Sequence, residues 1–128
     1  MITLILISLF RARQVTSNTI YGAVSIYLLI GMSFSVLYVF MGVFIPGSFY
    51  IDEAHNPGGR LELSAFIYFS FTTLTTLGYG DITPISSYAR SATNLEAVMG
   101  ILYVAILISR FVGIYIAQSA AIDKKKDV

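Results

Sequence analysis

The chain has 128 residues, of which 56% are hydrophobic and 12% are charged, and its formal net charge is +1. A charged fraction this far below that of a typical soluble domain indicates a membrane protein. The absence of cysteine excludes disulfides, thiol catalysis and thiolate metal sites, and the near-neutral charge gives no reason to expect a nucleic-acid partner.

The first part of the chain is an apolar segment followed by basic residues. Residues 1–10 are apolar, and Arg11 and Arg13 follow them. Ten residues are too few to cross a bilayer, and basic residues after the apolar run argue against a secretory signal. We expect residues 1–19 to be either an interfacial segment or the end of a preceding span.

Residues 20–45 form an uncharged run of 26 residues. As a helix this run would extend roughly 39 Å, more than the ~30 Å hydrocarbon core of a bilayer. Pro46 and Gly47 follow it and favour its termination. We therefore predict an outer helix over 20–45 and an outer loop over 46–62. His55 lies in this loop and is either a proton sensor or, more commonly for a lone loop histidine, only solvated.

Residues 64–75 are mainly apolar and aromatic but too few to cross a bilayer. Ser64 is available to cap the N-terminus of a short helix there. The helix would lead directly into irregular backbone rich in glycine, which is tolerated at membrane depth only where protein encloses it or where it faces water. The pattern predicts a half-span followed by a loop over 76–81.

The glycines of this loop favour a special use of its backbone carbonyls. Gly78 and Gly80 alternate with Leu77 and Tyr79 within the sequence Leu-Gly-Tyr-Gly-Asp. Lining one axis with consecutive carbonyls requires left-handed backbone at alternate residues, which glycine adopts without steric cost. The side chains of Leu77 and Tyr79 would then point away from that axis. A surface turn is the alternative for such a sequence, and the apolar flanking segments disfavour it.

A second span is predicted over residues 92–122, although Glu96 and Arg110 interrupt its apolar run. The uncharged part, 97–109, would be only roughly 20 Å of helix, so a buried or re-entrant segment is an alternative. A helix that lines a water-filled cavity can carry polar groups, and an arginine near a helix end can snorkel. We therefore expect an inner helix here, with a basic tail over 123–128.

This order of span, half-span, glycine loop and span resembles the pore domain of two-transmembrane potassium channels over roughly residues 20–122. The resemblance implies an all-α membrane protein in which an outer helix, a re-entrant pore helix with its selectivity filter and an inner helix form a homotetramer around a central pore. It also implies passive conduction of dehydrated K⁺ through rings of backbone carbonyls, for which the Thr-Val-Gly-Tyr-Gly filter is the established case.

The resemblance further implies which residues form the filter. K⁺ coordination is assigned to the backbone carbonyls of Thr76, Leu77, Gly78 and Tyr79, with the Thr76 hydroxyl added. Support of the filter is assigned to Gly80, Asp81, Thr72, Thr75, Tyr68, Phe69 and Glu96. In this set, Tyr68 and Phe69 take the place of an aromatic pair that braces the filter in the family.

Two of the assigned residues, one coordinating and one supporting, depart from the family pattern. Leu77 stands where valine or isoleucine is more frequent, and Thr72 stands where some relatives carry an acid that bonds the filter aspartate. Glu96 is a possible substitute for that acid if it reaches Asp81 or the filter backbone. A pair with Arg90, or snorkelling to the interface, is the alternative for Glu96.

Small residues on the inner helix suggest close packing. Gly100 lies where the family commonly has a hinge glycine, and packing against the pore helix explains it equally well. Beyond it, small residues recur at every fourth position, and this small-residue stripe consists of Ala105, Ser109, Gly113, Ala117 and Ala121. Such a stripe lets helices approach closely in lipid, so we expect it to face a neighbouring helix or the narrow end of the pore.

Basic residues give the expected orientation in the membrane. Five lie near the two ends of the chain, against two between residues 46 and 90. The positive-inside rule then places both termini in the cytoplasm and the filter outside, in a cell membrane that we expect to be a prokaryotic plasma membrane.

The expected partners are K⁺ ions, three identical subunits and the lipid bilayer, with no cofactor, no nucleic acid and no enzymatic activity. A weakly selective cation channel of the same fold, a potassium transporter subunit and a non-conducting scaffold or regulatory subunit are the alternatives. The sequence indicates no gating stimulus.

Overall fold

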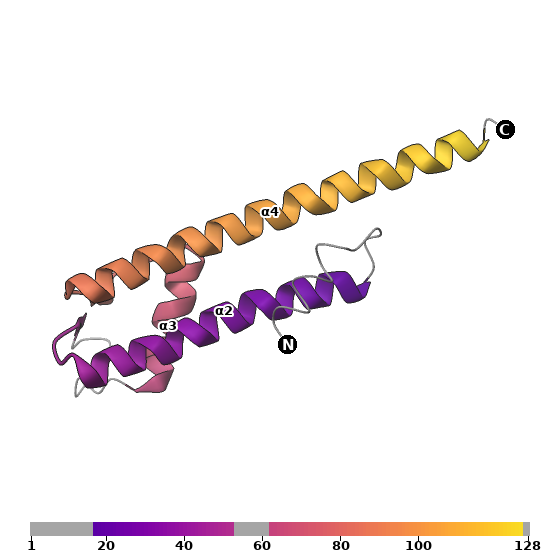
Figure 1. Cartoon of the computed structure of the whole chain (residues 1–128). Coiled ribbons are helices and arrows are strands. Elements are labelled where there is room, and N and C mark those ends of the chain that lie inside the picture. The colour runs from indigo at the N-terminus through magenta and orange to yellow at the C-terminus, as the bar shows by residue number, and fades with distance from the viewer. Residues whose placement is uncertain (1–16, 53–61, 127–128) are drawn as a thin grey trace. The chain divides into compact units, whose positions relative to one another are not determined.

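The computed structural model describes residues 17–52 and 62–126 (Figure 1). The fold is mostly helical, and its elements in chain order are α2 (Ser17–Phe44), β1 (Phe49–Ile51), α3 (Leu63–Leu74), β2 (Ile82–Pro84) and α4 (Ser87–Lys126). The two strands are an addition to the all-α architecture that the sequence predicts. The predictions for Arg11, Arg13, His55 and the apolar segment 1–10 lie outside the described residues.

Within residues 17–52 and 62–126, two helices are long and apolar enough to cross a membrane. By length and composition these stretches are Asn18–Phe44 in α2, with 27 residues, and Ser87–Ser119 in α4, with 33 residues. Helix α4 begins at Ser87, before the predicted start at residue 92. This early start has a local cause. The Ser86 hydroxyl accepts a hydrogen bond from the Ala89 backbone N–H at 3.2 Å, which is the contact of an N-cap serine.

The short helix α3 has 12 residues and begins one position before the expected start. Its N-cap is Glu62, which has an extended backbone and makes no side-chain capping bond, so the prediction of Ser64 as the cap is wrong. The Glu62 carbonyl instead accepts hydrogen bonds from the N–H groups of Ala65 at 3.0 Å and Phe66 at 3.3 Å. Backbone geometry at Glu62 therefore starts the helix before Ser64.

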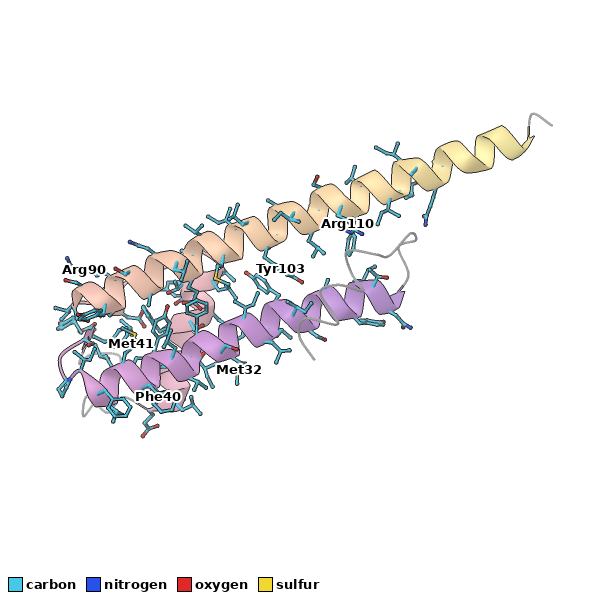
Figure 2. The ribbon with its side chains drawn as sticks, in the orientation of Figure 1. Met32, Phe40, Met41, Arg90, Tyr103 and Arg110 are labelled. Atoms are coloured by element: carbon cyan, nitrogen blue, oxygen red, sulfur yellow. The ribbon has the colours of Figure 1, made fainter. Side chains whose placement is uncertain are left out.

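Residues 29–102 form one compact unit, which holds α3, the two strands and the adjoining halves of the long helices. Its hydrophobic core consists of Tyr38, Phe49, Phe66, Phe69, Ile82 and Ala89. Most of the aromatic ring pairs in this core meet edge to face, with centroids 5.1 Å apart for Tyr38 and Phe69. Met41 of α2 packs against this core, whereas Phe40 is 55% exposed and points away from it (Figure 2).

The remaining described residues, 17–28 and 103–126, belong to a second compact unit. Within this unit the Tyr103 hydroxyl donates a hydrogen bond to the Ala23 carbonyl oxygen at 2.6 Å. The rings of Tyr27 and Tyr103 have centroids 5.7 Å apart. These contacts join the first part of α2 to the second part of α4.

The two strands pair antiparallel and connect the segment after α2 to the segment after the glycine loop. The register places Phe49 opposite Pro84, Tyr50 opposite Thr83 and Ile51 opposite Ile82. Hydrogen bonds run from the Asp52 N–H to the Asp81 carbonyl at 2.9 Å and from the Ile85 N–H to the Ser48 carbonyl at 2.8 Å. The sheet therefore fixes the chain directly after the expected filter.

Candidate functional site

The glycine loop has the alternating backbone that its sequence predicts. Gly78 has φ 51° and Gly80 has φ 85°, both in the left-handed region. Thr76 adds a third such position, with φ 60°, and it is the one non-glycine residue of the described chain with positive φ. A β-branched residue seldom adopts this conformation, so no feature of the sequence indicated it. Alternate residues 76, 78 and 80 thus have the conformation needed to turn consecutive carbonyls to one side.

The last turn of α3 holds the start of this loop. The Thr72 carbonyl oxygen accepts the N–H groups of Leu77 at 2.8 Å and Gly78 at 3.1 Å, and the Thr73 carbonyl accepts that of Thr76 at 2.9 Å. The Thr72 hydroxyl donates to the Phe69 carbonyl at 2.9 Å. Thr72 therefore contacts the loop through its backbone, a contact that does not depend on an acidic side chain at this position.

Two further residues of the expected filter support have clear partners. The Thr75 hydroxyl donates to the Phe71 carbonyl oxygen at 2.7 Å, which secures the C-terminal end of α3. The side chain of Tyr68 stacks on that of Tyr79, with ring centroids 6.2 Å apart and planes within 3°. Tyr68 thus contacts the loop from α3 through this ring stack, and its role in supporting a filter stays a prediction.

Asp81 acts on the same tyrosine. Desolvation, and then the interaction with the Asp81 carboxylate, raise the pKa of the Tyr68 hydroxyl above its usual value of 10.0. Phe69, by contrast, lies in the aromatic core with Tyr38 and Phe49. The two adjacent aromatics thus serve different contacts, one with the loop and one with the core.

Most of the glycine loop is exposed in the single chain, and Asp81 at its end is half-buried. Every residue from Thr75 to Gly80 is exposed, including the large side chains of Leu77 at 55% and Tyr79 at 67%. The carbonyls of one such strand can form only part of a ring around an ion. One chain therefore contributes one side of any coordination site built here.

Glu96 is fully buried, and its partners differ from those that the sequence suggested. The Tyr38 hydroxyl lies 2.6 Å from Oε2 of Glu96, and the Ser70 hydroxyl lies 2.5 Å from Oε1. The Ser70 oxygen is also 2.7 Å from the carbonyl oxygen of Gly31. These contacts link α2, α3 and α4, and they take the place of the suggested contacts with Asp81 or the filter backbone.

The two alternatives for Glu96, a pair with Arg90 and snorkelling to the interface, do not form either. Burial of the carboxyl group excludes snorkelling to the interface, and the Arg90 guanidinium donates to the Pro84 carbonyl at 3.3 Å. Sequence reasoning missed Tyr38 and Ser70 as partners. The available signal was the lone acid within an apolar span, which requires polar neighbours, together with Ser70 between the aromatic residues Phe69 and Phe71 of α3.

Two glycines allow α3 to approach the long helices closely. A Cβ added at Gly100 would overlap the Leu74 carbonyl oxygen, and one added at Gly31 would lie 2.8 Å from the Phe71 ring. At Gly100 the neighbouring atom belongs to the backbone and leaves no room for a side chain, whereas at Gly31 the neighbouring atoms belong to the end of the Phe71 side chain. The structure therefore shows the packing explanation for Gly100, and a hinge at this residue stays a prediction.

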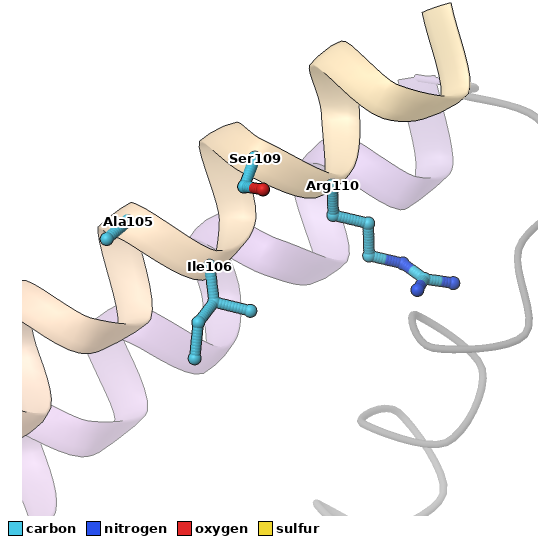
Figure 3. Close-up of a pocket in the computed structure, with 4 residues that line it drawn as sticks. All are labelled: Ala105, Ile106, Ser109 and Arg110. Carbon is cyan, nitrogen blue, oxygen red and sulfur yellow. The ribbon is translucent and has the colours of Figure 1, made fainter. Parts of the chain in front are cut away.

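The small-residue stripe lies along an exposed face of α4. Ala105, Ser109, Gly113 and Ala117 are all exposed in the single chain, and the side chain of Ala121 lies outside the described part. An open pocket of about 410 Å³ is lined by Ala105, Ile106, Ser109 and Arg110 (Figure 3). The expected contact of this stripe with a neighbouring helix stays a prediction.

Comparisons with known proteins agree with these features. The chain is 44% identical over 55 residues to the voltage-gated potassium channel Kch of Escherichia coli, a stretch covering 43% of this chain and 13% of that protein. It is 30% identical over 99 residues to two-pore potassium channel 4 of Arabidopsis thaliana, covering 76% of this chain and 34% of that protein. The chain thus spans about a third or less of the length of these relatives.

A family model described as "Ion channel" matches residues 38–117. The matched region runs from the second half of α2 through α3 and the glycine loop into α4, and it is more than half of the chain. It includes the whole loop and the helix that holds it. The chain therefore belongs to the ion channel family and contains a potassium channel pore domain.

Proposed function

We propose that this protein is a potassium-selective channel that conducts dehydrated K⁺ passively across a cell membrane. The observation that carries the proposal is the alternation of left-handed backbone at Thr76, Gly78 and Gly80, directly after α3. In this arrangement the carbonyls of residues 76–79 and the Thr76 hydroxyl replace the water that K⁺ loses on entering. No carboxylate is needed in the coordinating rings, and no cofactor takes part.

Four identical subunits complete the site. One strand cannot enclose an axis, and the exposure of Leu77 and Tyr79 in the single chain supports their coverage by neighbouring subunits. The number four comes from the resemblance to potassium channel pore domains. Each subunit contributes one filter strand, one pore helix and one face of α4.

The chain spans the membrane twice, with both termini in the cytoplasm and the filter near the outer side. Two helices of sufficient length support the spans, and the excess of basic residues near the chain ends supports the orientation. The membrane is proposed to be a prokaryotic plasma membrane. The gating stimulus is not part of this proposal.

A weakly selective cation channel of the same fold is the second candidate. Tyr79 and its stack on Tyr68 favour the selective channel, because a braced loop resists collapse around a smaller ion. A non-conducting scaffold or regulatory subunit is the third candidate, and the intact loop backbone disfavours it. These candidates differ in measurable current and in reversal potential.

The test is a current recording from the purified protein in a planar bilayer, with K⁺ on one side and Na⁺ on the other. A K⁺-selective pore gives a reversal potential displaced strongly toward the K⁺ equilibrium potential. A current that reverses near zero would contradict selectivity and favour the second candidate. A protein that stays silent under varied voltage, pH and lipid composition would favour the third.

Gly78→Ala provides the companion measurement. A Cβ at φ 51° strains the loop backbone, so K⁺ current is expected to fall at least tenfold. Gly47→Ala is the matched control, because Gly47 also has positive φ, at 81°, but lies in the turn after α2. Equal losses from the two substitutions would argue that the loop has no special role in conduction.

A further inference from the structure

The buried contact between Glu96 and its neighbours has more oxygen pairs than hydroxyl hydrogens. The Ser70 oxygen lies within hydrogen-bond distance of both the Gly31 carbonyl, at 2.7 Å, and Oε1 of Glu96, at 2.5 Å. The Tyr38 oxygen lies 2.6 Å from Oε2 of Glu96. The Ser35 hydroxyl also donates to the Gly31 carbonyl, at 2.8 Å. Four close oxygen pairs therefore need four hydrogens, whereas Ser35, Ser70 and Tyr38 supply one each.

The missing hydrogen has one position that makes every close oxygen pair a hydrogen bond. The Gly31 carbonyl can only accept, so the Ser70 hydroxyl donates to it. The Ser70 oxygen is then free to accept a hydrogen bond from Oε1 of Glu96, provided that Glu96 carries a proton there. Tyr38 donates to Oε2, which remains the carbonyl oxygen of the acid. Every pair is then a hydrogen bond, whereas an ionised Glu96 would leave two acceptors sharing the single hydrogen of Ser70.

The surroundings of Glu96 also favour the uncharged acid. Its side chain is fully buried, and its hydrogen-bond partners in the described part of the chain are two hydroxyls, neither of which carries a positive charge. Tyr38 from α2 is the titratable group that contacts it, and Ser70 is its contact from α3. A buried carboxylate without a cationic partner is strongly disfavoured relative to the neutral acid.

We propose that Glu96 is a protonated carboxylic acid in the folded protein and that, by donating to Ser70 and accepting from Tyr38, it is a positioning residue that joins α2, α3 and α4. Ser70 lies two residues before Thr72, whose carbonyl holds the filter. A shift of α3 therefore reaches the filter directly. The effect on the filter rests on the proposed function, whereas the protonation does not.

Infrared spectroscopy of the purified protein at neutral pH tests the protonation. A neutral carboxylic acid has a carbonyl-stretch band well separated from carboxylate bands, and we expect Glu96→Gln to remove such a band. Glu62→Gln is the matched control, because Glu62 is exposed, and it is expected to leave the band in place. A spectrum in which Glu96→Gln removes no neutral-acid band would overturn the proposal. This measurement needs no current. A protein that conducts no ions would therefore contradict the proposed function without affecting the infrared test of Glu96 protonation.

A second measurement applies if Glu96→Gln does not fold. Glu53, Glu62 and Glu96 are the three glutamates of the sequence, so a Glu53→Gln/Glu62→Gln protein retains Glu96 alone. Carbon-13 labelling of glutamate in that protein is expected to shift the neutral-acid band to lower frequency. No shift on labelling would count against the proposal. Tyr38→Phe is expected to shift the band upward, because the acid carbonyl loses its donor.

The positioning role is tested by comparing two substitutions at Glu96. Glutamine can still donate to Ser70 and accept from Tyr38, whereas alanine leaves both hydroxyls buried without this partner. We expect Glu96→Ala to lower the unfolding temperature and to shorten the time before current inactivates, with Glu96→Gln retaining most of both. Equal losses from glutamine and alanine would show that the carboxyl group acts in another way.

Discussion

Close backbone contact around α3 depends on single glycine residues. A Cβ placed on Gly100 would overlap the carbonyl oxygen of Leu74, which is the last residue of α3. A carbonyl oxygen belongs to the backbone and cannot rotate away as a side chain can. Relief therefore requires α3 and α4 to separate, and α3 leads directly into the glycine loop.

Gly100→Ala is accordingly expected to destabilise the protein, although alanine is the better helix former by roughly 1 kcal/mol. Overpacking of this kind costs about 1 to 3 kcal/mol, which exceeds that gain. Thermal unfolding of the reconstituted protein would measure the loss. Gly113→Ala is the matched control on the same helix, because its added Cβ meets no atom of its own chain within 4 Å, and a smaller effect is expected. Greater stability of Gly100→Ala than of the parent would contradict the close contact.

Within the candidate site, the sequence predicts the backbone of two residues and misses that of a third. Gly78 and Gly80 have the predicted left-handed backbone, because this preference is intrinsic to glycine. The same conformation at Thr76 was not foreseen, since a threonine adopts it only when surrounding contacts impose it. The carbonyl of Thr73, which accepts the Thr76 N–H at 2.9 Å, is one such contact.

At the level of elements, the short sheet β1–β2 fixes the segment that follows the filter. In an antiparallel ladder, hydrogen-bonded residue pairs alternate with non-hydrogen-bonded pairs. The pairs Asp52–Asp81 and Ser48–Ile85 are hydrogen-bonded, so the pair between them, Tyr50–Thr83, is a hydrogen-bonded pair as well. Pro84 then faces Phe49 in a non-bonded pair, where its missing N–H costs no ladder bond. The ladder thus accommodates proline at 84 but not at 83.

Thr83→Pro is expected to break this ladder and to loosen the exit of the filter. The substitution removes one backbone donor, worth about 1 kcal/mol, and restricts the preceding residue as well. K⁺ currents in bilayers should inactivate faster as a result. Thr83→Ala keeps the N–H and loses only the side chain, so its currents should resemble those of the parent. Inactivation that is equally fast in both variants would point to the hydroxyl in place of the ladder.

In the whole molecule, the role of the exposed small-residue stripe on α4 depends on how the subunits assemble. A Cβ added at Gly113 would meet no atom of its own chain within 4 Å, so a larger side chain there is tolerated within one subunit. If the stripe packs against a neighbouring helix, the same side chain prevents close approach in lipid.

Gly113→Leu is therefore expected to weaken the assembly while each subunit still folds. Native mass spectrometry would follow the species at about four times the subunit mass of 14.1 kDa. Val112→Leu is the control, because Val112 is a neighbouring exposed residue, at 51%, outside the stripe. A tetramer unaffected by Gly113→Leu would place the stripe away from the subunit contacts.

Patterns of contiguous residues were enough to predict the membrane class, the two long helices, the short helix between them and the glycine loop. Each of these depends on properties of contiguous residues, namely apolar length against bilayer thickness and the conformational freedom of glycine. Tertiary structure decided the partners of Glu96, the contact of Gly100 with Leu74, the strand pairing and the separate contacts of Tyr68 and Phe69. These join residues far apart in the chain, 58 positions for Tyr38 and Glu96, and no local pattern specifies which distant side chain fills a buried position.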